Sequence, residues 1–147
     1  MNVYVDTSAF VKYFHTETGS TSVISVIDEK SNHVYFSELT IIEFKCALYR
    51  RHRNNEINEQ ELDIVLSEFA HENLKFNIES LSSSVISEAN NLLGKYAKTH
   101  YLRTLDSLHL ATFNLISEKD WMFLSADDIL NQVVQIMGYK VVNPLDI

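Results

Sequence analysis

Four acidic residues of this 147-residue chain stand in apolar surroundings. Most of the twenty acidic residues lie in solvated runs such as 56–61, where the outer face of a helix accounts for the charge. The exceptions interrupt or directly follow the most apolar segments, and they are Asp6, Glu43, Asp106 and Asp127. Carboxylates are rarely buried unless they are paired or bind a metal, and few basic residues accompany these four. The set therefore indicates one acidic pocket that holds a cation.

Each of these acids also has a purely structural interpretation. Asp6 and Asp127 precede expected helices and could serve as their N-caps. Asp106 lies near a helix start, where negative charge suits the helix dipole. Glu43, in the middle of an expected helix, has the weakest structural reason. Because the structural interpretations must hold independently while one pocket explains all four acids, we prefer the pocket.

Several neighbours could support such a site. Ser8 and Ser125 place hydroxyls at strand ends near the acids, although serine is also common there as a cap or turn residue. Asp128 is an alternative to Asp127 as the functional acid. His109, three residues after Asp106, could hydrogen-bond to it or be an ordinary core histidine. The sequence contains no Gly-x-Ser-x-Gly motif, so nucleophilic serine chemistry is unsupported.

The elements that must position these residues alternate between strand and helix. Short apolar runs predict strands over 2–5, 33–36, 74–78, 121–124 and 140–142. Amphipathic segments predict helices over 8–14, 21–29, 37–53, 58–71, 82–98, 104–117 and 127–137. This alternation predicts an α/β domain over 1–147, with a mainly parallel sheet of four to five strands and helices on both faces. Ligands of such sheets bind beyond the carboxyl ends of the strands, where Asp6 and Asp127 are expected.

The helical periodicity also predicts which faces are inward. For the helix over 37–53, the predicted face comprises Leu39, Ile42, Cys46 and Tyr49, flanked by Ile41, Phe44 and Leu48. For the helix over 104–117, the predicted inward residues are Leu105, Leu108, Ala111, Thr112 and Leu115.

Charge and composition narrow the function. Twelve basic and twenty acidic residues give a net charge of −8, which argues against a simple nucleic-acid-binding module but not against a nuclease with clustered carboxylates. The basic residues that could contact a phosphate backbone are Lys12, Arg50, Arg51, Lys98 and Arg103. With only three glycines, no glycine-rich phosphate loop can be written.

The sequence also suggests a cellular setting. The single cysteine, Cys46, cannot form an internal disulfide, which favours a reducing environment. Neither a signal peptide nor an apolar run of about 18 to 20 residues is apparent. We expect a soluble, cytoplasmic protein without membrane contact.

The chain resembles the PIN-domain family, and specifically VapC-type toxins of toxin–antitoxin pairs. The matching stretches occur in family order and are Val3 to Lys12, Ser37 to Phe44, Leu102 to Thr112, Phe123 to Leu130 and Lys140 to Pro144. Each stretch alone is weak evidence for the resemblance, but together the stretches span almost the whole chain. Ser125 stands where the family often has threonine, a change that keeps the hydroxyl.

The resemblance implies a metal-dependent endoribonuclease with catalytic, metal-binding acids at Asp6, Glu43, Asp106 and Asp127. It also implies a homodimer, an RNA substrate and a cognate antitoxin. Mg²⁺ or Mn²⁺ suits an all-oxygen ligand set. We assign Asp6 and Asp106 to the main ion, and Asp127 and Glu43 to a second ion or to positioning the attacking water.

Three other functions remain open from sequence. A PIN domain could act as a non-catalytic interaction module, or the same acids could serve a DNA-directed nuclease. Asp6 could also be a phosphoacceptor, but no second aspartate completes an Asp-x-Asp motif with it. Without metal, packed carboxylates should raise the pKa of at least one member.

Overall fold

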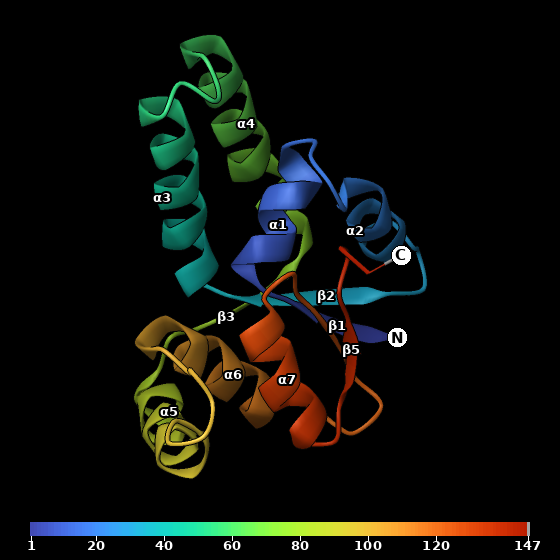
Figure 1. Ribbon diagram of the computed structural model, residues 1–147. Coiled ribbons are helices and arrows are strands. Elements are labelled where there is room, and N and C mark those ends of the chain that lie inside the picture. Colours follow the sequence, from blue (N-terminus) through green and yellow to red (C-terminus); the bar gives the residue numbers. More distant parts are fainter. Residues whose placement is uncertain (147) are drawn as a thin grey trace.

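Five parallel strands form one sheet in the order β3-β2-β1-β4-β5 (Figure 1). This is a computed structural model, and it describes residues 1–146. The strands are β1 (Asn2–Val5), β2 (His33–Ser37), β3 (Asn77–Glu79), β4 (Met122–Leu124) and β5 (Lys140–Val142). The predicted α/β class with a parallel sheet is therefore confirmed.

The central position of β1 follows from its composition. Val3, Tyr4 and Val5 are fully buried, and β1 pairs with β2 on one side and β4 on the other. A strand that is apolar on both faces is buried only when it pairs with a strand on each edge and helices cover both of its faces. Asp6, the first residue after β1, is thereby placed at the middle of the carboxyl edge.

Helices cover both faces of the sheet (Figure 1). The helices α1 (Thr7–Phe14), α2 (Ser20–Ile27), α3 (Leu39–Arg53) and α4 (Glu59–Glu72) lie on one side. On the other side lie α5 (Ser83–Tyr96), α6 (Thr104–Ile116) and α7 (Asp128–Ile136). A short 3₁₀ turn, Asn73–Lys75, connects α4 to β3.

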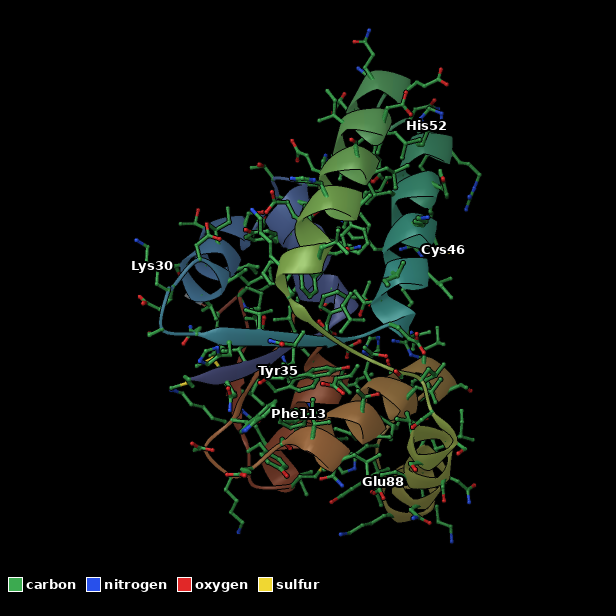
Figure 2. The ribbon with its side chains drawn as sticks, turned by 180° about the vertical axis from the view of Figure 1, so that it is seen from behind. Lys30, Tyr35, Cys46, His52, Glu88 and Phe113 are labelled. Carbon is green, nitrogen blue, oxygen red and sulfur yellow. The ribbon has the colours of Figure 1, made fainter. Side chains whose placement is uncertain are left out.

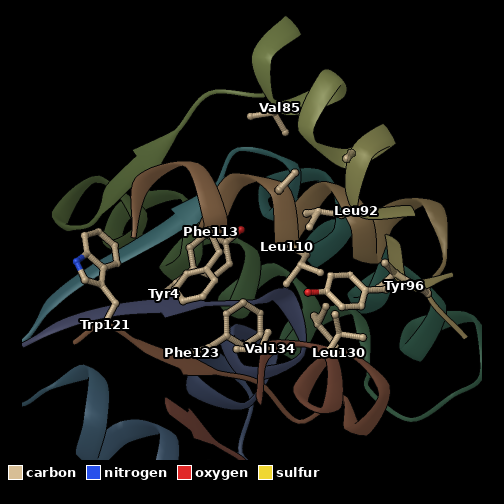
Figure 3. Packing of buried hydrophobic residues seen from close by; sticks show 14 residues of the cluster. Tyr4, Val85, Leu92, Tyr96, Leu110, Phe113, Trp121, Phe123, Leu130 and Val134 are labelled. Carbon is tan, nitrogen blue, oxygen red and sulfur yellow. The ribbon is translucent and has the colours of Figure 1, made fainter. Parts of the chain in front are cut away.

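Aromatic side chains fill the core beneath α5, α6 and α7 (Figure 3). Tyr4 of β1 stacks on Phe123 of β4 with ring centroids 5.4 Å apart, and Phe113 of α6 packs edge-on to Phe123 at 5.0 Å. These contacts lock α6 onto the two central strands, which fixes the residues that α6 presents at the sheet edge.

The helices α3 and α4 form a pair that extends away from the sheet (Figures 1 and 2). Phe44 of α3 stacks on Phe69 of α4 at 4.0 Å, and Phe14 of α1 packs against both rings. This separate core, rather than the sheet, holds α3 in place.

The predicted inward faces of two helices are only partly confirmed. In α3 the buried residues are Leu39, Thr40, Phe44 and Leu48, whereas Ile42, Cys46 and Tyr49 are exposed. In α6, the predicted Ala111 and Thr112 are buried, but Leu105 and Leu115 are exposed. Asp106 and His109 are buried instead. Each helix carries two apolar stripes, and periodicity alone does not reveal which stripe faces the neighbouring helices.

The remaining differences are at element boundaries. The predicted strand over 74–78 begins with the 3₁₀ turn, and the strand itself is Asn77–Glu79. The helix predicted from residue 37 begins at Leu39, because the hydroxyl of Ser37 accepts a hydrogen bond from the Leu39 amide at the turn. Within residues 1–146, no helix is both long and apolar enough to cross a membrane.

Candidate active site

A cavity of about 800 Å³ opens at the carboxyl edge of the sheet, between α3 on one side and α6 and α7 on the other. The four acids singled out in the sequence all line it, and they are Asp6, Glu43, Asp106 and Asp127. They come from four different elements or junctions, so the fold itself brings them together.

Asp6 lies deepest of the four. It is 5% exposed, and its side chain caps α1 by accepting a hydrogen bond from the Ala9 amide at 3.2 Å. The hydroxyls of Ser8 and Ser125 donate to its two carboxylate oxygens at 2.6 and 2.8 Å. Burial raises the pKa of the Asp6 carboxyl, and these hydrogen bonds only partly offset that effect. A raised pKa was expected, but its main cause is desolvation and not repulsion between the acids.

Ser8 and Ser125 also join Asp6 to the next acid. The Ser125 hydroxyl accepts a hydrogen bond from the Asp127 amide at 3.0 Å, and the Ser8 hydroxyl accepts one from the Ala126 amide at 2.9 Å. Both serines therefore donate to Asp6 and accept from the β4–α7 loop. They fix the distance between the two strand ends.

Asp106 and Asp127 share a guanidinium group. Arg103 donates from Nε to Asp106 at 3.0 Å and from Nη2 to Asp127 at 3.3 Å. The Asp106 carboxylate also accepts the Arg103 backbone amide, and Asp127 caps α7 through the Leu130 amide at 3.0 Å. The two carboxylates, one from α6 and one preceding α7, thus converge on a single positive charge.

Helix capping and a shared acidic pocket are therefore not mutually exclusive roles for these acids. Asp6 and Asp127 are N-caps, and Asp106 accepts a hydrogen bond from the backbone amide of Arg103, the residue before α6. Each carboxylate has more acceptor positions than a cap uses. Capping therefore orients these side chains toward the cavity.

Glu43 enters from α3 and is held by two other side chains. Its Oε1 accepts a hydrogen bond of 2.8 Å from the Thr7 hydroxyl and contacts Nε2 of His109. Burial alone would raise the pKa of Glu43. The hydrogen bonds from His109 and Thr7, together with the positive charges of His109 and Arg103, outweigh burial and lower this pKa. Glu43 is accordingly favoured as a carboxylate.

The basic residues predicted to contact phosphate, and Asp128, fall into two groups. Lys12, Arg50, Arg51 and Arg103 line the cavity, whereas Lys98 and Asp128 do not. The Asp128 carboxylate instead accepts a hydrogen bond from the Asn143 side chain, so Asp127 is the acid that faces the cavity. Lys98 follows the end of α5 on the exposed surface.

Besides Arg103, two more of these basic residues are in ion pairs. Glu17 accepts from Lys12 at 3.0 Å and from Arg51 at 2.7 Å, and His15 contacts the same arginine. Glu17 itself lines the cavity. It lowers the positive potential that the two basic residues would otherwise offer to a phosphate.

The donor chemistry of the cavity suits a hard divalent cation. The carboxylates of Glu43, Asp106 and Asp127 and the hydroxyls of Thr7 and Ser8 line the cavity with Asp6. Two of these carboxylates, Asp106 and Asp127, already share the positive charge of Arg103. Among residues 1–146, no three histidine, cysteine, aspartate or glutamate side chains are close enough to form a ready-made metal cage. Mg²⁺ commonly uses one or two carboxylates and keeps several waters, so this arrangement fits such an ion.

Sequence reasoning missed some of the site's hydrogen bonds. Thr7 follows Asp6 directly but serves Glu43, and Tyr4 reaches the site from inside the core through His109. The sequence left open a hydrogen bond between His109 and Asp106. In the structure, His109 bonds to Glu43 and Tyr4 instead. Only the position of Thr7 within an Asp-Thr-Ser strand end could have signalled its role.

The fold and this site define a class of protein. A family model described as PIN domain matches residues 3–134, and the chain belongs to the PIN-domain family. It is 34% identical over 139 residues to Ribonuclease VapC45 of Mycobacterium tuberculosis, covering 95% of this chain and 93% of that protein.

Solved structures share the fold at lower identity. The crystal structure of FitAcB from Neisseria gonorrhoeae has a TM-score of 0.72 at 18% identity, and the alignment covers 99% of both chains. A toxin–antitoxin complex from Klebsiella pneumoniae has a TM-score of 0.61 at 21% identity, again over 99% of both chains.

Proposed function

We propose that this chain is a metal-dependent endoribonuclease and the toxin of a VapBC-type toxin–antitoxin pair. The observation that carries the proposal is the convergence of four carboxylates on one cavity, with two of them bridged by a guanidinium. The similarity to a protein named as a VapC ribonuclease supports the choice of RNA over DNA as substrate. An RNA substrate would also agree with the cytoplasmic location predicted from the sequence.

The proposed cofactor is Mg²⁺ or Mn²⁺. Asp6 and Asp106 would hold the main ion, and Glu43 and Asp127 a second ion or the attacking water. When bound, the metal supplies a water of lowered pKa and charge stabilisation at the phosphodiester.

The protein's own residues have separate tasks in this scheme. Ser8 and Ser125 keep the Asp6 carboxylate pointed into the cavity, and Thr7 does the same for Glu43. Phosphate groups flanking the cleaved bond would be held by Lys12, Arg50, Arg51 and Arg103 at the cavity rim, with Lys98 as a more distant contact. Asp128 keeps only a supporting role through its contact with Asn143.

The proposed partners are an antitoxin and a second copy of the chain. The structural neighbour described as a toxin–antitoxin complex supports the antitoxin. The acidic cavity would favour a basic inhibitor segment on electrostatic grounds. Homodimer formation rests on the family resemblance.

The test is cleavage of total cellular RNA by purified protein in Mg²⁺, in Mn²⁺ and in EDTA, alongside the Asp6→Asn variant. Discrete fragments that require metal and disappear in the variant are expected. A parallel incubation with single- and double-stranded DNA separates the ribonuclease from a DNA-directed enzyme. Metal binding without cleavage of either nucleic acid would favour the non-catalytic interaction module.

A further inference from the structure

A buried chain of hydrogen bonds runs from the core to Glu43. The Tyr4 hydroxyl lies 3.0 Å from Nδ1 of His109, and Nε2 of the same ring contacts the Glu43 carboxylate. Tyr4 belongs to β1, His109 to α6 and Glu43 to α3. Tyr4 is fully buried and His109 is 4% exposed, so water does not compete for the inner contact.

The chemistry of the chain sets the direction of each bond. A carboxylate is only an acceptor, so Nε2 of His109 must carry the hydrogen that faces Glu43. In a neutral ring Nδ1 is then an acceptor, which the Tyr4 hydroxyl satisfies as donor. Burial holds the pKa of the Tyr4 phenol well above its usual range, which keeps that hydroxyl protonated.

The same contact bridges the two helical layers. Glu43 is on α3, which packs on α1 and α4, while His109 is on α6 across the sheet edge (Figure 1). Tyr4 packs against Phe113 and Phe123 (Figure 3). The His109 ring lies edge-on to Tyr4, with ring centroids 6.3 Å apart. The long Glu43 side chain is therefore tied to the buried aromatic core.

We infer that His109 is a positioning residue that, backed by Tyr4, holds the Glu43 carboxylate in its working orientation at the cavity. The inference rests on the proposed nuclease function and adds two residues to it. His109 touches neither the other three acids nor the basic rim through a hydrogen bond within residues 1–146. The hydrogen bonds of His109 therefore act on the acids through Glu43, and through Thr7 on the same carboxylate oxygen.

The sharpest test compares two amide substitutions of His109. The Gln amide nitrogen occupies about the place of Nε2 and can still donate to Glu43, whereas the Asn amide corresponds to Nδ1 and cannot reach it. We expect His109→Asn to lower kcat by about 10- to 100-fold, with KM for RNA changed by less than about twofold, since outer partners of site carboxylates have effects of this size. His109→Gln should restore most of the loss.

Controls separate orientation from simple loss of stability. Leu110→Val alters a buried neighbour on the same helix and should leave kcat within about twofold of wild type at temperatures below melting. Tyr4→Phe removes only the inner bond, and a smaller loss than that of His109→Asn is expected. Equal kcat values for the Asn and Gln variants, or an unchanged kcat in both, would overturn the inference.

If the wild-type protein does not cleave RNA, the proposed function is refuted. The positioning role of His109 can still be tested by NMR spectroscopy. The ¹⁵N ring signals of His109, assigned by comparison with His109→Gln, should report the Nε2-protonated tautomer in wild type. The tautomer preference should weaken in Glu43→Leu and in Tyr4→Phe. An Nδ1-protonated ring in the wild-type protein contradicts the positioning role whether or not the protein is active.

Discussion

The hydroxyl of Ser125 donates a hydrogen bond of 2.8 Å to Oδ2 of Asp6, although 119 positions separate the two residues in the sequence. Pairing of β1 with β4 places their carboxyl ends side by side, so the residue after each strand meets the other. The same hydroxyl accepts from the Asp127 amide. One serine thus sets the relative position of two candidate catalytic acids.

Removal of this hydroxyl should therefore impair the site more than the fold. We expect Ser125→Ala to lower RNA cleavage by about 10- to 100-fold and the free energy of unfolding by about 1–3 kcal/mol, because the Asp127 amide loses its partner. Ser20→Ala is the matched control, since Ser20 is also buried and its hydroxyl bonds only to backbone atoms, not to any of the four candidate catalytic acids. If both variants lose activity equally, Ser125 has no particular role.

Asp6→Asn should separate activity from stability. Asparagine can keep the N-cap bond to Ala9 while removing a buried charge, so the metal-free variant should melt no lower than wild type. Cleavage should fall by about two orders of magnitude or more, since the ion loses a ligand. Thermal melts in EDTA and RNA cleavage assays measure the two effects, with the exposed Asp63→Asn as control. A much lower melting temperature would favour capping as the only role of Asp6.

The stability of the metal-free protein should depend on pH with a sign set by Asp6. Its pKa is raised on folding, so its contribution to stability is fully present below the unfolded pKa of about 4 and is lost as pH rises through the folded pKa. Glu43 has the opposite sign, because its lowered pKa contributes stability above the unfolded value that is lost on acidification.

We therefore expect the melting temperature of wild type, relative to Asp6→Asn, to decrease as pH rises from about 4 to about 7. Measurement is by thermal melts in EDTA across this range. Melting curves of the two proteins that shift in parallel with pH would contradict a raised pKa at Asp6.

Arg103 should compete with the metal for Asp106 and Asp127. The guanidinium is largely exposed, so its ion pairs are weak, and Arg103→Gln should tighten Mn²⁺ binding by only about two- to fivefold. Calorimetric titration of the metal-free protein measures this, with Arg53→Gln as a control for loss of an arginine outside the cavity. Weaker Mn²⁺ binding in Arg103→Gln would show that the arginine organises the carboxylates instead.

Glu17 should limit RNA binding by masking two basic residues. Glu17→Gln frees Lys12 and Arg51, so binding of a catalytically inactive protein to RNA should tighten several-fold at low salt. The slope of log affinity against log salt should steepen by about 0.7 for each additional phosphate that the protein neutralises. Glu29→Gln makes the same change of net charge outside the cavity. Identical salt slopes for the two variants would refute the masking role.

The sequence by itself determined the fold class and the four acids. Short apolar runs that alternate with amphipathic helices define a parallel α/β sheet, because such strands cannot be exposed on either face. A carboxylate within an apolar segment needs a charged or hydrogen-bonding partner. This requirement identified four acids before their positions were known, namely Asp6, Glu43, Asp106 and Asp127. The raised pKa of at least one acid was also foreseeable, although not that burial would be its main cause at Asp6.

Only the tertiary structure decided how those acids are held. Side-chain bonds between Ser125 and Asp6, Arg103 and Asp127, and His109 and Glu43 join residues that no sequence spacing relates, since strand order and helix packing bring them together. The inward faces of α3 and α6 were decided in the same way. Ile42 is 64% exposed although it lies on an apolar stripe, because the stacking of Phe44 on Phe69 selects the other stripe for the core.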